Sequence, residues 1–177
     1  MANQEIPKLI IVSPCYNEEA ILRYSADTLT SFLKRVIALR KIAPSSRILY
    51  VNDGSRDRTW SLIEELHKDN SFVEGLSLAK NVGSELAVMA GMMAARERAD
   101  VVVTIDADLQ DDVEAIEEMI NHYLAGCDIV YGVKTSREAD PWLKRITAEG
   151  FYRLQQNMGI NVIFNHTNFR LMSKRAL

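Results

Sequence analysis

The stretch 100-DVVVTIDADLQDD-112 joins an unbroken apolar run to a cluster of aspartates, and this junction indicates the fold. Its apolar part is short and β-branched, which is typical of a strand buried on both faces of a sheet. The aspartates follow at once, so they are expected at the carboxyl end of that strand. In open parallel sheets, ligands bind in the crevice outside those ends.

The rest of the chain, up to residue 133, repeats this order of strand and helix. Short apolar runs alternate with longer segments whose apolar residues recur at helical spacing. Such alternation predicts an α/β fold with a mostly parallel sheet and helices on both faces. The predicted strands are 8–13, 47–52, 72–79, 100–106 and 128–133, and the predicted helices are 20–40, 59–68, 84–97 and 113–125.

Beyond residue 133 the alternation ends. We expect a charged loop over 134–141, and a helical stretch follows in which aromatic residues mix with cations. Its part Trp142–Gln156 could lie on a membrane surface or pack against the core or a partner helix. A further helix is expected to begin at Ser173. We expect one domain over 1–177 that is truncated at its carboxyl end.

Composition excludes several classes of protein. The 177 residues are 47% hydrophobic, which is enough for one sizeable core. A net charge of −3 argues against nucleic acid as a partner. Cys15 and Cys127 are expected to be reduced thiols, and no cysteine–histidine cluster indicates zinc. The chain contains neither G-x-x-x-x-G-K-[ST] nor G-x-G-x-x-G, so a Walker-type NTPase and a dinucleotide-binding oxidoreductase are disfavoured.

Asp106, Asp108 and Gln110 are candidate ligands of a cation. If the strand stays extended across these positions, its period of two places the three side chains on one face. Two carboxylates and an amide oxygen suit Mg²⁺ or Mn²⁺, with phosphate and water completing the shell. The alternative is a solvated loop that caps the next helix. We adopt that alternative for Asp111 and Asp112, which lie at the first turn of the predicted helix.

The stretch 14-PCYNEE-19 follows the first strand and opens the first helix. Asn17 could be the N-cap of that helix, and Glu18 and Glu19 could complement its dipole. The same residues could instead line a ligand site, because they lie at a strand end.

Two more polar stretches follow strands. In 52-NDGSRD-57, Asp53 either stabilises a turn or accepts a hydrogen bond from a nucleobase or ribose. In 80-KNVGSE-85, Lys80 and a glycine precede a helix, which suits an anion such as phosphate or forms a plain turn. Strand ends that converge on one edge of the sheet predict a binding site there.

The sequence as a whole resembles glycosyltransferase family 2, within the GT-A nucleotide-diphosphosugar fold. It is most similar to the branch that moves a sugar onto polyprenyl phosphate, the dolichol-phosphate mannose synthase and bactoprenol glucosyltransferase type. The matching stretches are 13-SPCYNEEA-20, 50-YVNDGSRDRTW-60, 78-LAKNVGSELAVMAGM-92, 102-VVTIDADLQDD-112, 129-IVYGVKTSRE-138 and 168-NFRLMSKRA-176. The resemblance implies a catalytic domain with a nucleotide-sugar-binding core at 5–133 and an acceptor side at 134–177.

The resemblance implies roles residue by residue. Asp106, Asp108 and Gln110 would hold Mg²⁺ or Mn²⁺ on the donor diphosphate, and Asp53 would read the base. The expected nucleotide-sugar contacts are Pro14, Tyr16, Asn17, Glu18 and Asp53, with Lys80 and Arg137 on phosphate.

Asn168 is a departure from the family pattern. Relatives commonly carry aspartate at this position of 167-TNFRL-171, and that aspartate is the usual candidate for the catalytic base. Asparagine cannot take a proton at neutral pH. A polyprenyl phosphate needs no base, because its oxygen is already ionised. Asn168 therefore favours a phosphate acceptor or a weakened enzyme.

The resemblance implies a metal-dependent hexosyltransferase that uses a UDP- or GDP-linked sugar and inverts the anomeric carbon. The expected acceptor is polyprenyl phosphate, which implies a cytoplasmic location at the inner face of a membrane. The alternatives are a transferase acting on a glycan hydroxyl, a non-catalytic nucleotide-sugar-binding fragment, and a phosphohydrolase that uses Asp106 and Asp108.

Overall fold

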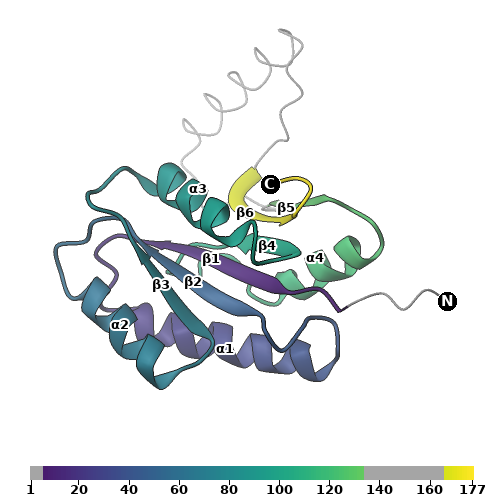
Figure 1. Cartoon of the computed structure of the whole chain (residues 1–177), viewed down its shortest axis with the longest axis horizontal. Helices are drawn as coiled ribbons and strands as arrows, with labels where there is room; N and C mark the ends of the chain where they lie inside the picture. The colour runs from purple at the N-terminus through teal and green to yellow at the C-terminus, as the bar shows by residue number, and fades with distance from the viewer. Residues whose placement is uncertain (1–5, 134–165) are drawn as a thin grey trace, which may run out of the picture.

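The computed structural model describes residues 6–133 and 166–177 (Figure 1). Within them, six strands form one sheet in the order β3-β2-β1-β4-β6-β5. The strands are β1 (Leu9–Cys15), β2 (Arg47–Asn52), β3 (Val73–Ser77), β4 (Val101–Thr104), β5 (Ile129–Val133) and β6 (His166–Ser173). The helices are α1 (Leu22–Ala38), α2 (Thr59–Asp69), α3 (Ser84–Ala95) and α4 (Ala115–Leu124). All nine elements predicted up to residue 133 are confirmed, with shifts of a few residues at their ends.

The strand order reverses beside β1. This strand pairs in parallel with β2 on one side and with β4 on the other, and β2 pairs in parallel with β3. All seven residues of β1 are buried, because the strand is central and both of its faces are covered. The carboxyl ends of β1 and β4 therefore flank a switch point, where open α/β sheets bind ligands.

Helices cover both faces of the sheet unequally (Figure 1). On one face, α1, α2 and α4 bury a large core with the odd-numbered apolar residues of β1 and β4. On the other face, α3 packs alone among the described helices, over Val12, Val51 and Val102. A Cβ atom at Gly91 would overlap the side chains of Val12 and Val51, so this glycine allows α3 to lie close against the sheet.

β6 was not predicted. It pairs antiparallel with β4 and β5 and so separates them, which makes the sheet mixed at this edge. The missed signal is an alternation in which Phe169, Leu171 and Ser173 are buried between more exposed neighbours. The helix expected from Ser173 is not tested: Ser173 ends β6, and the next residues form a turn in which the N–H groups of Ala176 and Leu177 donate to the Ser173 carbonyl.

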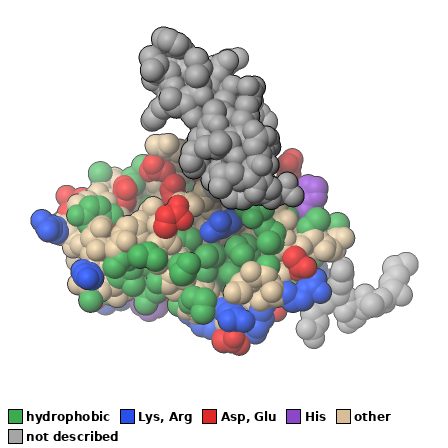
Figure 2. All heavy atoms as spheres, turned by 90° about the horizontal axis from the view of Figure 1, so that it is seen from above, with side chains coloured by type: hydrophobic (Ala, Val, Ile, Leu, Met, Phe, Trp, Pro, Cys, Tyr) green, Lys and Arg blue, Asp and Glu red, His purple; other side chains and the backbone are tan. Residues whose placement is uncertain are grey.

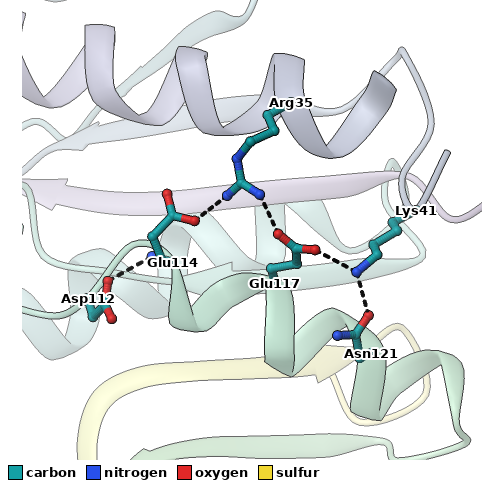
Figure 3. A network of polar contacts seen from close by, with 6 residues as sticks. All are labelled: Arg35, Lys41, Asp112, Glu114, Glu117 and Asn121. Atoms are coloured by element: carbon teal, nitrogen blue, oxygen red, sulfur yellow. Dashed lines mark hydrogen bonds and ion pairs between the residues drawn. The ribbon is translucent and has the colours of Figure 1, made fainter. Parts of the chain in front are cut away.

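Polar contacts join α1 to α4 on the three-helix face (Figure 3). Arg35 pairs with both Glu114 and Glu117. Lys41 Nζ lies 2.6 Å from a Glu117 carboxylate oxygen and donates to Asn121 Oδ1 at 2.9 Å. The hydrogen bonds from Lys41 and Arg35 lower the pKa of Glu117. These acidic side chains are therefore matched by cations.

Part of the chain lies outside this description. The predicted loop 134–141, the stretch Trp142–Gln156 and Arg137 fall within 134–165, which the structure does not describe. In the described part, no helix has both the length and the apolar character needed to span a membrane.

Candidate functional site

A hollow of about 440 Å³ opens at the switch point. It lies where the carboxyl ends of β1, β2 and β4 meet the amino end of α3. The residues that line it are Pro14, Cys15, Tyr16, Glu18, Asp53, Asn81, Gly83, Ser84, Asp106, Ala107 and Asp108. Three separate strand ends thus converge on one pocket, as the sequence predicted. None of the described lining residues is Lys or Arg.

The predicted site residues divide into three groups. Those that line the pocket are Pro14, Tyr16, Glu18, Asp53, Asp106 and Asp108. Those absent from the described lining are Asn17, Lys80, Gln110 and Asn168. Arg137 lies outside the described residues.

Asn17 holds a neighbouring turn instead of entering the pocket. Its backbone is left-handed, with φ of 57°, and its Oδ1 accepts a hydrogen bond from the Arg56 N–H at 2.9 Å. Its own N–H donates to Ser55 Oγ at 3.0 Å. The expected N-cap role is wrong, because α1 begins later, at Leu22, and Ile21 occupies the N-cap position.

Further bonds fix the loop after β1 to the turn after β2. The Glu18 N–H donates to Thr59 Oγ1 at 2.8 Å, and the Glu19 N–H donates to Asp57 Oδ2 at 3.2 Å. A carboxylate oxygen of Glu19 in turn accepts from the Arg58 N–H at 2.9 Å. With its backbone fixed in this way, Glu18 contributes to the pocket wall.

The environment of Glu18 is acidic. Its pKa is raised, first by burial and then by the negative charges of Asp108, Asp57 and Asp106. Burial also raises the pKa of the neighbouring Cys15 thiol, and Glu18 adds to that rise, so Cys15 stays protonated. Negative charge accumulates in the pocket because several carboxylates from different loops share it.

Asp53 fastens the loop that precedes α3. It is 2% exposed, and its two carboxylate oxygens accept hydrogen bonds from the N–H groups of Val82 at 2.7 Å and Gly83 at 2.9 Å. At Gly54, φ is 64°, and a Cβ there would stand 2.5 Å from the Asn81 backbone nitrogen. The two loops therefore meet without room for a side chain.

Three lining residues of this loop were missed by sequence reasoning. Asn81, Gly83 and Ser84 line the pocket, whereas Lys80 was the predicted contact. The stretch 80-KNVGSE-85 had already indicated an anion site at a helix start. The loop thus lines the pocket with uncharged residues rather than with its cation.

The aspartate stretch leaves the sheet earlier than expected. β4 ends at Thr104, and the Leu109 N–H donates to the Asp106 carbonyl at 3.1 Å, with Leu109 at φ 51°. The extended geometry proposed for the three ligands is therefore wrong. The turn still leaves Asp106 and Asp108 in the pocket wall, while Gln110 is exposed.

The expectation that Asp111 and Asp112 cap the next helix is wrong, because α4 begins at Ala115 and its N-cap is Glu114, whose side chain forms no cap hydrogen bond. Asp112 instead holds the turn that precedes the helix. Its Oδ1 accepts from the Glu114 N–H at 2.9 Å, and its carbonyl accepts from the Ala115 N–H at 3.1 Å, where α4 begins. Thus neighbouring aspartates of one stretch differ in role: Asp106 and Asp108 line the pocket, and Asp112 holds the turn that leads into α4.

The pocket wall is not a closed metal site. In ranges 6–133 and 166–177, no group of three or more His, Cys, Asp or Glu side chains is arranged to hold a metal ion. Asp106 and Asp108 supply hard oxygen donors only, which suits Mg²⁺ or Mn²⁺ when substrate phosphates and water provide the other ligands. The donor set therefore fits a cation that arrives with a phosphorylated ligand.

Asn168 lies near this edge of the sheet. The antiparallel register pairs Arg170 with Thr104, the last residue of β4. Position 168 therefore lies two residues beyond the carboxyl end of β4, level with Asp106. The Thr104 hydroxyl donates to the Asn168 carbonyl. These contacts place the backbone of Asn168 beside the aspartate turn.

The sequence model described as "Glycosyl transferase family 2" matches residues 10–177. The chain belongs to glycosyltransferase family 2. The chain is 49% identical over 174 residues to an uncharacterized glycosyltransferase, YkoT, of Bacillus subtilis (strain 168), covering 98% of this chain and 52% of that protein. It is 36% identical over 172 residues to the bactoprenol glucosyl transferase of Shigella phage SfV, covering 96% of this chain and 53% of the relative.

A solved structure supports the fold. Glucosyl-3-phosphoglycerate synthase from Mycobacterium tuberculosis, in complex with Mn²⁺, UDP and glucosyl-3-phosphoglycerate, matches with a TM-score of 0.64 and 16% identity. The match covers 96% of this chain and 57% of that one. The chain thus has the expected GT-A fold. It spans about half the length of the curated relatives described above.

Proposed function

We propose that this chain carries the donor-binding and catalytic part of an inverting, metal-dependent hexosyltransferase that uses a UDP- or GDP-linked sugar. One observation carries the proposal: Glu18, Asp53, Asp106 and Asp108 line a single pocket at the switch point of the sheet. Acidic walls repel an anionic nucleotide unless a divalent cation lies between them. A binding site for a diphosphate is then built from the protein's oxygens, the cation and the ligand's own oxygens.

The donor's nucleotide would lie toward the loops after β1 and β2. Tyr16 is 43% exposed at the pocket, and its ring offers a flat surface on which a base can stack. Asp53, which holds Val82 and Gly83, keeps the amino end of α3 against the pocket. The first N–H groups of α3 have no partner within the helix, and such groups suit a phosphate oxygen.

Asp106 and Asp108 would hold the cation at the diphosphate. Bound there, Mg²⁺ or Mn²⁺ would neutralise the charge that grows on the departing nucleoside diphosphate. The Mn²⁺ and UDP of the solved glucosyl-3-phosphoglycerate synthase complex support this proposal. Lys80, Arg137 and Gln110 remain predicted contacts to this part of the ligand.

The acceptor we propose is polyprenyl phosphate. Its ionised oxygen would attack the anomeric carbon of an α-linked donor from the opposite side and give a β-linked product. Asn168 is compatible with this acceptor, because an ionised phosphate needs no base. Similarity to a bactoprenol glucosyl transferase supports the same choice. Such an acceptor implies that the enzyme works at the inner face of a membrane.

Calorimetric titration with UDP and GDP, with and without Mn²⁺, tests donor and metal together. We expect one nucleoside diphosphate to bind in the presence of Mn²⁺, and Asp108→Asn to weaken that binding by about tenfold or more. Asp112→Asn is the matched control, because it changes the same stretch outside the pocket. Equal affinity with and without metal would refute the metal assignment.

Transfer assays separate the remaining alternatives. Incubation with a labelled nucleotide sugar and polyprenyl phosphate should give a labelled lipid. Labelled glycan in place of lipid would identify a hydroxyl acceptor, and phosphate release without transfer would identify a phosphohydrolase. Donor binding with no turnover on any acceptor would identify a binding fragment.

A further inference from the structure

α3 is apolar on its outer face as well as on its inner one. Of its twelve residues, only Ser84 and Glu85 are polar, and both lie in the first turn. Its inner face packs on the sheet through Ala87, Val88, Gly91 and Ala95. A helix that is apolar all round is normally covered on every side.

The outer face carries a stripe of large side chains, which we call the α3 stripe: Leu86, Met89 and Met93. They are 54%, 55% and 56% exposed. Spacings of three and four residues place them in one row along the helix. Figure 2, which views the molecule from the α3 side, shows hydrophobic side chains gathered in a band across this face.

We propose that the α3 stripe is a surface by which the chain rests on a lipid bilayer. This inference rests on the proposed function, in which the acceptor is a lipid phosphate. Leu and Met are flexible, apolar side chains that adapt to a fluid medium. Half-exposed apolar side chains in a row gain free energy when a hydrocarbon boundary covers them.

The position of the stripe favours a bilayer over a soluble partner. Gly83 and Ser84 line the donor pocket, and Leu86 follows two residues later. Whatever covers the stripe therefore lies beside the pocket opening, where the acceptor must enter. A soluble protein bound there would obstruct the acceptor, whereas a bilayer delivers it.

Charged side chains flank the α3 stripe without interrupting it. From Leu86 to Ala95 the helix carries no acidic side chain. Exposed charges of both signs stand at its two ends, Lys80 and Glu85 at the start and Arg96 and Glu97 at the end. The apolar side chains of the stripe therefore make the contact that we propose.

Vesicle co-sedimentation tests the proposal with the 177-residue chain. The vesicles contain phosphatidylcholine and phosphatidylglycerol in equal amounts, with phosphatidylcholine alone for comparison. We compare the parent chain with the triple variant Leu86→Gln, Met89→Gln and Met93→Gln. We expect the triple variant to bind anionic vesicles ~10-fold more weakly or worse, because it loses the apolar contact.

The matched control changes exposed apolar residues on the opposite side of the sheet. Tyr24 and Leu39, in and just after α1, are 64% and 54% exposed. Tyr24→Gln with Leu39→Gln should leave vesicle binding unchanged. Both variants should keep the parent's circular dichroism and UDP affinity, which separates loss of the lipid contact from loss of the fold or donor site.

Three results would overturn the inference. They are no vesicle binding by the parent chain, equal binding by the α3 variant, and loss of a dimer in light scattering with no change in vesicle binding. The last would identify the stripe as a contact between copies. None of them affects the donor-binding experiment, so the two proposals fail separately.

Discussion

Two clusters of acidic side chains in this protein differ in what surrounds them. Between α1 and α4, Glu117 lies against Arg35 and Lys41, and its pKa is lowered. In the pocket, Glu18 lies near Asp106 and Asp108, and its pKa is raised. The first cluster is neutralised within the protein. The second concentrates negative charge at a strand switch point, which suits a ligand that brings cations.

Acidic composition alone therefore does not define a site. The stretch 104-TIDADLQDD-112 and the start of α4 are adjacent in sequence, yet their carboxylates serve different purposes. Whether a carboxylate is neutralised or lines the pocket depends on which charged side chains other loops and helices place beside it.

The largest expected effect is on the rate of sugar transfer when a pocket aspartate is replaced. Asp106→Asn or Asp108→Asn should reduce the rate of sugar transfer by roughly 100-fold or more, because charge on the leaving diphosphate loses its counterion. Steady-state kinetics with a labelled donor measures this. Glu114→Gln, which changes the other cluster, should leave the rate unchanged. Equal rates for Asp108→Asn and the parent would contradict the division between the clusters.

A second change tests whether Asp53 holds the loop before α3. Asp53→Asn replaces an acceptor with an NH₂ group that faces a backbone N–H, so one of Val82 and Gly83 loses its partner. Leaving such a buried donor unsatisfied costs about 1–3 kcal/mol. Urea unfolding should show this loss, together with weaker UDP binding. The exposed Asp27→Asn is the control; weaker binding with unchanged stability would instead favour direct contact with the nucleotide.

A smaller effect is expected in the neutralised cluster. Glu117→Gln removes partly exposed ion pairs with Arg35 and Lys41, and ion pairs that solvent reaches contribute little. The thermal midpoint should fall by roughly 1–3 °C, with no change in UDP affinity. Differential scanning calorimetry and titration measure the two quantities. A change in affinity would show that the α1–α4 contacts influence the pocket.

The smallest effect is the opposite pH dependence of two substitutions. Because the pKa of Glu18 is raised in the folded state, its ionised form opposes folding at neutral pH. Glu18→Gln should therefore raise the thermal midpoint at pH 7, and the gain should vanish below the unfolded-state pKa of about 4.3.

For Glu117 the sign is reversed. Its lowered pKa means that its charge stabilises the fold above the unfolded-state pKa, and this stability is lost as pH falls through the lowered folded-state pKa. The destabilisation by Glu117→Gln should therefore persist to lower pH than the gain from Glu18→Gln. Thermal unfolding between pH 3 and about pH 8 compares them, and parallel pH profiles would refute the contrast.

Much of the fold was predictable because its signals are local. The strands β1, β2 and β4 are short apolar runs, and the helices have apolar residues at helical spacing. β6 escaped prediction because its pattern is short and its partners β4 and β5 lie far away in sequence. Only pairing with distant strands shows that this segment is extended.

The sequence was enough to place the candidate site at the carboxyl ends of the strands, but not to say which side chains line it. Asp106 and Asp108 enter the pocket wall as expected, but through a turn rather than an extended strand. Asn17 and Gln110, two predicted contacts, are absent from the described lining. Single residues with positive φ, Asn17 and Leu109, redirect the side chains around them, and apolar periodicity carries no information about such turns.

The sequence by itself determined the order of strands and helices and the edge of the sheet where polar residues gather. Apolar periodicity sets these features, because it reports which side of each segment is buried. The tertiary structure alone decided which carboxylates share a pocket and which are paired with cations. That decision depends on contacts between segments far apart in sequence, such as Asp53 with Val82 and Arg35 with Glu117.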